Sequence, residues 1–348
     1  MLGEAAAADL AVIPVGGGRA LGMGDPPARV DLALHTSRLD RIVDFSPHDL
    51  TVTVEAGIEL EALQAELAKA KQFLPLDPFG GPGHTIGGLL ASGWSGPLRL
   101  RYGTARDYLV GLRVALPDGK LARSGGRVVK NVSGYDLNKL HLGALGTLGV
   151  IVEASFKLFP LPLREVTVRR EADSFEDAWQ EAGRALSLAM PPVALEMLRT
   201  DAGYSLVARI AGSEEGVRRI HRELGWDKTP SVFWAELSES GSRSWARLSV
   251  RSQELRELLR SLPPRARWIA QPGVGVAYWF GLESADRFRA VRAAAEKLGG
   301  SAVLLAASAE LKREVGAWGK PPATIELMRR VRAAFDPKGT LSPGRYLV

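Results

Sequence analysis

The sequence predicts an α+β protein with two domains. Its 348 residues exceed what one hydrophobic core usually organises. Residues 1–160 combine short apolar strands with three glycine-rich segments, whereas residues 161–310 repeat one pattern of strands and helices twice. Residues 311–348 break that repeat, and we expect them to return to the first domain.

The first domain opens with a short strand, "AVIPV", followed by three consecutive glycines. Alternating or β-branched residues between turn residues predict three more strands, in "RVDLALHT", "RIVDFSPHD" and "LTVTVEAG". The spacing of Leu60, Leu63 and Leu67 predicts a helix in "IELEALQAELAKAKQ". A hairpin follows in "YLVGLRVALPDGKLARS", then a short helix in "SGYDLNKLHLGALG" and a buried strand in "GVIVEASFKLF". The proline-rich "PLPL" marks the expected domain boundary.

The second domain is predicted from a repeat of roughly 80 residues. Its first copy reads as the strand "EVTVRRE", the helix "FEDAWQEAGRALSL", the strands "VALEML" and "YSLVARIA", the helix "EEGVRRIHREL" and the strand "SVFWAEL". The second copy has the same order, from "WARLSVR" to "SAVLLAA". Two such βαββαβ units side by side predict one antiparallel sheet with helices on one face, which leaves the opposite face free to cover something.

The composition excludes several classes of function. The chain has no cysteine, which excludes disulfides, a thiolate nucleophile, a cysteine-held zinc and an iron–sulfur cluster in this chain. The net charge of +6 is spread over the sequence without a nucleic-acid-binding motif, so we predict no nucleic-acid partner. No apolar run approaches the ~20 residues of a membrane span, and no signal peptide is evident, so we expect a cytoplasmic protein without a membrane span.

The glycine run of "AVIPVGGGRALGMG" is compatible with an anion site or with a structural turn. Successive backbone N–H groups in a glycine-rich turn form a concavity that suits a phosphate. The nicotinamide fingerprint is excluded because the run leads into Pro26 and Pro27, which the interior of the required helix does not tolerate. The Walker motif is excluded because no lysine occurs before Lys69. Taken alone, this run favours a structural turn.

Two further glycine-rich segments change that interpretation. "LDPFGGPGHTIGGLLASGWSG" and "KNVSGYDLNKLHLGALGTLGVI" follow in the same domain, and "AFDPKGTLSPGR" stands near the C-terminus. Together with "PVGGG", these motifs resemble the FAD-binding vanillyl-alcohol oxidase and p-cresol methylhydroxylase (PCMH-type) family over nearly the whole chain. The resemblance implies a PCMH-type FAD-binding domain of two α+β subdomains over residues 1–160. It also implies a cap domain over residues 161–310, whose sheet lies over the isoalloxazine ring.

The resemblance also implies which positions bind the cofactor. The five residues after the first strand match the pyrophosphate loop, the next six match the loop beside the pyrophosphate and flavin, and the last three match a strand start beside the adenine. These positions are Gly16, Gly17, Gly18, Arg19, Ala20, Thr85, Ile86, Gly88, Ala91, Ser92, Gly103, Gly149, Val150 and Ile151. Val150 and Ile151 are read equally well as core strand residues. Covalent members of the family often have a histidine where this chain has Arg19, so non-covalent FAD is expected.

No catalytic residue is assigned. Oxidation of a 2-hydroxy acid requires a base for the hydroxyl proton and a cation for the carboxylate. The family's catalytic histidines are absent from the cap, where the one histidine, His221, is expected on a helix surface. His84 is the histidine expected nearest the flavin, and Arg101 and Tyr102 are alternatives beside it. The candidates on cap strands are Glu196, Arg199, Arg209 and Trp279.

Three functions remain open. The first, which the resemblance favours, is the FAD-binding subunit of a complex that oxidises glycolate or another 2-hydroxy acid. Its partners would be a catalytic FAD subunit and an iron–sulfur subunit, and it would be cytoplasmic or peripheral to the inner membrane through that complex. The second is a self-sufficient FAD-dependent oxidase or dehydrogenase of another small hydroxylated substrate. The third is an assembly subunit whose FAD site is empty.

Overall fold

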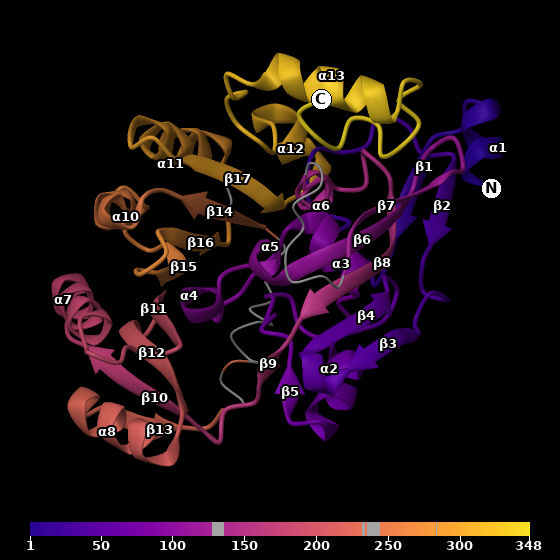
Figure 1. Ribbon diagram of the computed structural model, residues 1–348. Coiled ribbons are helices and arrows are strands. Elements are labelled where there is room, and N and C mark those ends of the chain that lie inside the picture. The colour runs from indigo at the N-terminus through magenta and orange to yellow at the C-terminus, as the bar shows by residue number, and fades with distance from the viewer. Residues whose placement is uncertain (127–135, 232–233, 235–243, 283) are drawn as a thin grey trace. The chain divides into compact units, whose positions relative to one another are not determined.

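The computed structural model describes residues 1–126, 136–231, 234, 244–282 and 284–348 (Figure 1). The chain forms two compact units. The first comprises residues 1–95, 104–161 and 320–348, and the second comprises residues 96–103 and 162–319.

Two boundaries differ from those expected. Residues 96–103 group with the second unit because α4 (Arg99–Tyr102) packs against β11 (Ala194–Thr200). The C-terminal return begins at residue 320 instead of 311, because α12 (Ala309–Val315) packs against α11 (Ala285–Lys297) of the second unit.

The first unit is built on a five-stranded antiparallel sheet with the order β3-β4-β8-β6-β7. The central strands are held by apolar side chains, and Val52 and Val54 of β4 are fully buried. The predicted hairpin is present as β6 and β7. The bounds are β3 Ile42–Ser46, β4 Thr51–Glu55, β8 Val150–Lys157, β6 Leu109–Ala115 and β7 Leu121–Gly125.

Two smaller sheets and several helices complete this unit. The strand before the glycine run, β1, pairs in parallel with β2, and β5 pairs with β9. The predicted helix over residues 58–72 is present as α2, which buries Leu60, Leu63 and Leu67. The first three residues of the stretch "SGYDLNKLHLGALG" lie outside the described residues, and in the rest the predicted helix is present only as the single turn α6. The bounds are β1 Val12–Val15, β2 Leu32–His35, β5 Gln72–Phe73, β9 Phe159–Pro160, α1 Leu2–Ala7, η1 Pro47–Asp49, α2 Leu60–Lys69, α3 Ile86–Ser92, α5 Ala105–Tyr108, α6 Asn138–His141 and α13 Ile325–Phe335.

The second unit contains one eight-stranded antiparallel sheet with the order β13-β10-β12-β11-β15-β16-β14-β17. Each half has the chain order βαββαβ, and the halves join where β11 pairs with β15. The fourth strand of the first half is β13, whereas the predicted strand "SVFWAEL" lies mostly outside the described residues. The bounds are β10 Arg164–Ala172, α7 Phe175–Leu186, β12 Gly203–Gly212, α8 Glu214–Leu224, β13 Asp227–Thr229, β14 Trp245–Ser249, η2 Ser252–Glu254, α10 Leu255–Arg260, β15 Arg267–Gln271, β16 Val276–Phe280 and β17 Ser301–Ala306.

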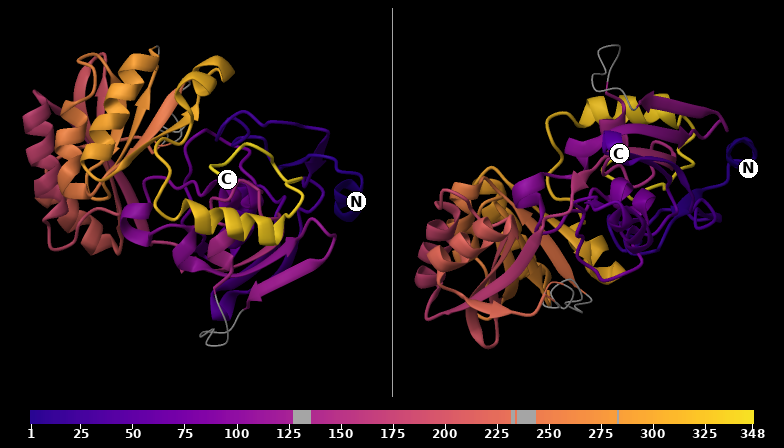
Figure 2. Two further views of the ribbon diagram at one scale, coloured as in Figure 1. Left: turned by 90° about the horizontal axis from the view of Figure 1, so that it is seen from above. Right: turned by 60° about the horizontal axis from the view of Figure 1, so that its bottom comes forward.

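Helices α7, α8, α10 and α11 lie on one face of this sheet, which we call the helix-covered face (Figure 2). Local sequence explains three of their starts. Ser174, Ser213 and Ser284 are N-caps whose hydroxyl accepts a hydrogen bond from the third helical N–H. Every second strand residue packs against these helices, and the residues between them point to the opposite face.

None of the helices in the described part of the chain is long and apolar enough to cross a membrane.

Candidate cofactor-binding site

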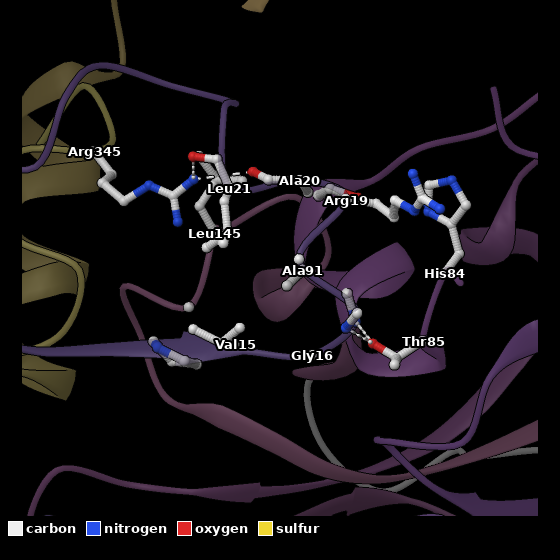
Figure 3. Close-up of a pocket in the computed structure, with 16 residues that line it drawn as sticks. Val15, Gly16, Arg19, Ala20, Leu21, His84, Thr85, Ala91, Leu145 and Arg345 are labelled. Atoms are coloured by element: carbon white, nitrogen blue, oxygen red, sulfur yellow. Dashed lines mark hydrogen bonds between the residues drawn. The ribbon is translucent and has the colours of Figure 1, made fainter. Parts of the chain in front are cut away.

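The first unit contains a hollow of about 70 Å³ between the glycine run, the start of α3 and the C-terminal segment (Figure 3). A hollow of this size holds a few water molecules or one phosphate group and not a whole dinucleotide. Nine of the predicted positions line it: Gly16, Gly17, Gly18, Arg19, Ala20, Thr85, Gly88, Ala91 and Ser92.

The first two glycines are required by contact between two loops. A Cβ on Gly16 would lie 2.1 Å from Thr85 Oγ1, and a Cβ on Gly17 would lie 1.8 Å from the carbonyl oxygen of Gly83. The Gly17 N–H donates a hydrogen bond to Thr85 Oγ1 at 3.3 Å. These two glycines therefore bring the first loop against the second and leave the Gly17 N–H already bonded.

The backbone N–H groups of the next three residues, Gly18, Arg19 and Ala20, are available to a ligand. Gly18 has a φ of +76° and opens the backbone into a turn that the Leu21 N–H closes on the Gly18 carbonyl at 3.2 Å. In the part of the chain that the structure describes, the N–H groups of Gly18, Arg19 and Ala20 bond to no acceptor. Successive unbonded N–H groups in such a turn form an anion-binding concavity.

Thr85 joins the two loops at the start of α3. It is the N-cap of that helix, and its hydroxyl accepts from the Gly88 N–H as well as from Gly17, each at 3.3 Å. Behind it, the Ala91 carbonyl accepts from the Leu145 N–H at 2.8 Å, which fixes the third glycine-rich segment to the helix. The walls of the hollow are therefore tied to one another by backbone groups.

Arg345 lines the hollow and was not among the predicted positions. Its guanidinium is buried and donates to the carbonyls of Ala20, Leu21 and Met23 at 2.7–3.0 Å. Burial lowers the pKa of this group. Arg345 thereby bonds three backbone carbonyls of the first loop. It belongs to "AFDPKGTLSPGR", so the sequence carried a signal for it, but its contacts lie more than 300 residues away along the chain. Pro14, Val15, Leu21, His84, Leu145 and Gly146 also line the hollow without having been predicted for it.

Arg19 is the cation that is available to a ligand in this hollow. Its side chain is exposed and extends toward His84 (Figure 3). Burial lowers the pKa of the His84 imidazole from 6.5 to about 4, so this ring is neutral at neutral pH. His84 Nε2 lies 3.0 Å from the Phe79 carbonyl, and the ring packs edge-on against Trp94. His84 therefore supports the wall and supplies no positive charge.

Five predicted positions do not line the hollow. Ile86 is fully buried in α3. Gly149 lies at the start of β8, where a Cβ would come within 2.5 Å of Val114 Cγ1. Val150 and Ile151 are buried strand residues, which the alternative interpretation expected. Gly103 ends α4 in the second unit. Packing accounts for these positions, and their cofactor roles remain predictions.

The candidates on the second unit divide between the two faces of its sheet. Glu196 and Arg209 point to the opposite face, because they alternate with residues of the helix-side core. Arg209 stacks over Trp234 at 4.6 Å and lies 3.7 Å from Glu165. Arg199 and Trp279 lie on the helix-covered face, so the four cap candidates do not all point to one face of the sheet.

The remaining candidates have structural partners. His221 Nε2 lies 3.1 Å from the Trp226 carbonyl, near the end of α8. Burial raises the pKa of the Tyr102 hydroxyl. Within the described residues, no group of three or more histidines and carboxylates could hold a metal ion.

In chemistry and in size, the hollow fits one phosphate of a dinucleotide's pyrophosphate. It offers unbonded N–H groups, one exposed cation and no carboxylate among the residues that line it. A glycine at position 18 leaves open space where a side chain would stand. The donor set is therefore that of an anion site built mainly from backbone.

Comparisons with known proteins agree with this geometry. A family model described as an FAD binding domain matches residues 1–125, and a model described as the C-terminal domain of FAD linked oxidases matches residues 288–346. The chain is 32% identical to the glycolate oxidase subunit GlcE of Escherichia coli (strain K12), over 87% of this chain and 84% of that protein. It is 35% identical to the glycolate oxidase subunit GlcD of Bacillus subtilis (strain 168), over 54% of this chain and 40% of that protein.

A solved structure of alkyldihydroxyacetonephosphate synthase superposes with a TM-score of 0.72 at 18% identity, covering 99% of this chain and 74% of that chain. This likeness shows a shared mixed α+β fold. The extent and identity of the match to GlcE show that the chain belongs to the PCMH-type family of FAD-linked oxidases and is an FAD-linked oxidoreductase similar to GlcE.

Proposed function

We propose that this chain binds FAD without a covalent bond and is the FAD-binding subunit of a complex that oxidises glycolate or another 2-hydroxy acid. One observation carries the cofactor part of this proposal: the unbonded N–H groups of Gly18, Arg19 and Ala20 face one small hollow. Two phosphates that are charged at neutral pH suit such donors and the Arg19 guanidinium.

The residues of the chain have separate tasks in this proposal. FAD, when bound, would supply a two-electron carrier to the complex. The loop of Gly18, Arg19 and Ala20 would hold its pyrophosphate, and Thr85 would keep the two glycine loops together. Arg345 would keep the carbonyls of Ala20, Leu21 and Met23 bonded, which leaves them less free to repel the anion.

The absence of a covalent bond is inferred from the residues that line the hollow. A covalent link to the flavin requires a nucleophilic side chain, and the chain has no cysteine. His84 is the histidine that lines the hollow, but it is buried and its Nε2 is bonded to the Phe79 carbonyl. Arg19 is not a nucleophile because its guanidinium stays protonated.

We propose that the second unit is the cap and that the opposite face of its sheet covers the isoalloxazine ring. The support is that this face carries buried polar side chains. Thr167 accepts from Trp234 Nε1 at 2.9 Å, and Glu196 accepts from Gln271 Nε2 at 2.8 Å. Buried polar groups of this kind are expected where a sheet faces a polar ligand instead of a hydrophobic core.

The partners are inferred from what the chain lacks. Without cysteine it has no ligands for an iron–sulfur cluster, so electrons that reach its flavin must pass to another chain, to oxygen or to a soluble acceptor. The described part of the second unit has one histidine, which is bonded at the end of a helix and is not placed as a base. We therefore propose a catalytic FAD subunit and an iron–sulfur subunit as partners. The protein would be cytoplasmic, or peripheral to the inner membrane through the complex.

The test is steady-state turnover with an artificial dye acceptor and a panel of 2-hydroxy acids that includes glycolate and lactate. We expect negligible turnover by the isolated FAD-loaded chain and turnover when both partner subunits are added. Rapid anaerobic bleaching of the flavin by one of these acids, with no partner present, would refute the subunit proposal. It would support the alternative of a self-sufficient oxidase or dehydrogenase.

A further inference from the structure

The second unit carries a groove of about 930 Å³ that plays no part in the proposed cofactor site. It lies between the segment that follows α10, the end of β16 and the first half of α11. Its floor is apolar, because Leu262, Trp279 and Val291 are buried there. The groove is large enough for several side chains of another molecule.

Three arginines from different elements surround this floor. Arg265 follows α10, Arg267 begins β15 and Arg287 lies in the first turn of α11. All three are exposed, and their guanidinium groups pair with no side chain among the described residues. No carboxylate from the described part of the chain lines the groove. Among the described residues, the groove therefore gathers three exposed arginines around an apolar centre.

The internal repeat shows that the fold does not require two of these arginines, Arg287 and Arg265. Ser213 caps α8 through the N–H of Gly216, just as Ser284 caps α11 through the N–H of Arg287. A Cβ on Gly216 would lie 3.1 Å from Met190 Cε, so an apolar side chain fills the corresponding place in the first half.

The loop before the next strand differs in the same way. Pro191 and Pro192 are followed by the buried Val193, whereas Pro263 and Pro264 are followed by the exposed Arg265. At these two positions the first half of the repeat has Gly216 and Val193, and the second half has Arg287 and Arg265.

We infer that this groove docks an acidic segment of a partner subunit, with an apolar side chain of that segment against Trp279. The inference rests on the proposed function, because it names the surface through which the proposed complex forms. Arginine is enriched in protein interfaces and binds carboxylates in a bidentate manner. An apolar floor with a charged rim is the usual anatomy of such a site, and complementary charge steers association. A small anion would use the arginines and leave the apolar floor without a partner.

The experiment uses the full FAD-loaded chain together with the larger flavoprotein subunit and the iron–sulfur subunit of its own organism. The test variant is Arg265→Glu combined with Arg287→Glu. The matched control is Arg218→Glu combined with Arg222→Glu, two exposed arginines on α8 that carry the same change of charge. Light scattering after size-exclusion chromatography measures the mass of the complex. Titration of each form of this chain with the partner subunits at low salt measures the affinity. Bound FAD is measured in each variant.

We expect the test variant to weaken the complex at least about tenfold, with FAD occupancy unchanged, and the control to change it less than about twofold. If wild type, the test variant and the control variant form the complex with equal affinity, the docking inference is wrong while the proposed function stands. If wild type forms no complex, both fail. One further outcome would overturn the inference. If citrate protects the groove arginines from an arginine-specific chemical reagent, and both variants bind the partner subunits as tightly as wild type, the groove is a small-anion site.

Discussion

Replacing Arg19 with glutamine tests the electrostatic part of the proposed cofactor site. Arg19 lines the hollow, is exposed, and makes no hydrogen bond or ion pair with a described side chain. The substitution removes a positive charge and keeps much of the length of the side chain. We therefore expect weaker FAD binding without a loss of folding stability.

The magnitude follows from the distance and the exposure of the charge. Two unit charges 4 Å apart interact by about 4 kcal/mol at an effective dielectric constant of 20 and by about 1 kcal/mol in bulk water. The exposed position of Arg19 places the loss toward the lower end, at about 1–2 kcal/mol. This corresponds to a dissociation constant for FAD that rises by roughly 5-fold to 30-fold.

The assay is a fluorescence titration of the apoprotein with FAD at two salt concentrations, with denaturant unfolding of each apoprotein. Arg38→Gln is the control, because Arg38 is an exposed arginine of the same unit that does not line the hollow. We expect the difference between the Arg19 variant and wild type to shrink as salt rises. Equal FAD affinity for wild type and the Arg19 variant at low salt would refute the role of Arg19 in binding the pyrophosphate.

Two further predictions concern packing and pH. Gly17→Ala should abolish FAD binding and destabilise the apoprotein, because the new Cβ would lie 1.8 Å from the Gly83 carbonyl oxygen. The control is Gly183→Ala in α7, where a new Cβ would meet no atom within 4 Å, and this change should stabilise the protein slightly. A Gly17→Ala protein with wild-type melting temperature would contradict this. Burial lowers the pKa of both His84 and His141 to about 4 in the folded protein, so the unfolded chain binds more protons below pH 6.5 and stability falls with the pH. Between pH 7 and pH 5 each histidine should contribute about 2 kcal/mol to this loss. Unfolding curves of His84→Gln and His141→Gln should show a shallower pH dependence, and slopes equal to wild type would refute the assignment.

The role of the glycine run shows where sequence reasoning succeeded and where it stopped. Glycines after a strand are costly without a local reason, and the cluster lines the hollow. The individual tasks were not predictable. Gly16 and Gly17 are small because the loop around Thr85 touches them, and the donors left unbonded are those of Gly18, Arg19 and Ala20. That contact joins positions 68 residues apart in the sequence.

The second unit was predictable in its order because each element has its own periodicity. The alternation of buried residues in its strands and the serine caps of α7, α8 and α11 are local signals. The three-residue strand β13 was missed, since so short a strand has no pattern of its own. Arg345 was missed as a site residue because its three carbonyl partners are distant in sequence.

The most direct test of the account is the flavin content of the purified chain. Acid denaturation followed by centrifugation should release one FAD per chain, with all of the yellow colour in the supernatant. This result would agree with a pyrophosphate site made of backbone donors and Arg19 in a chain that has no cysteine. Colour that stays in the pellet would contradict non-covalent binding. A colourless protein that also fails to take up added FAD would contradict the cofactor site itself.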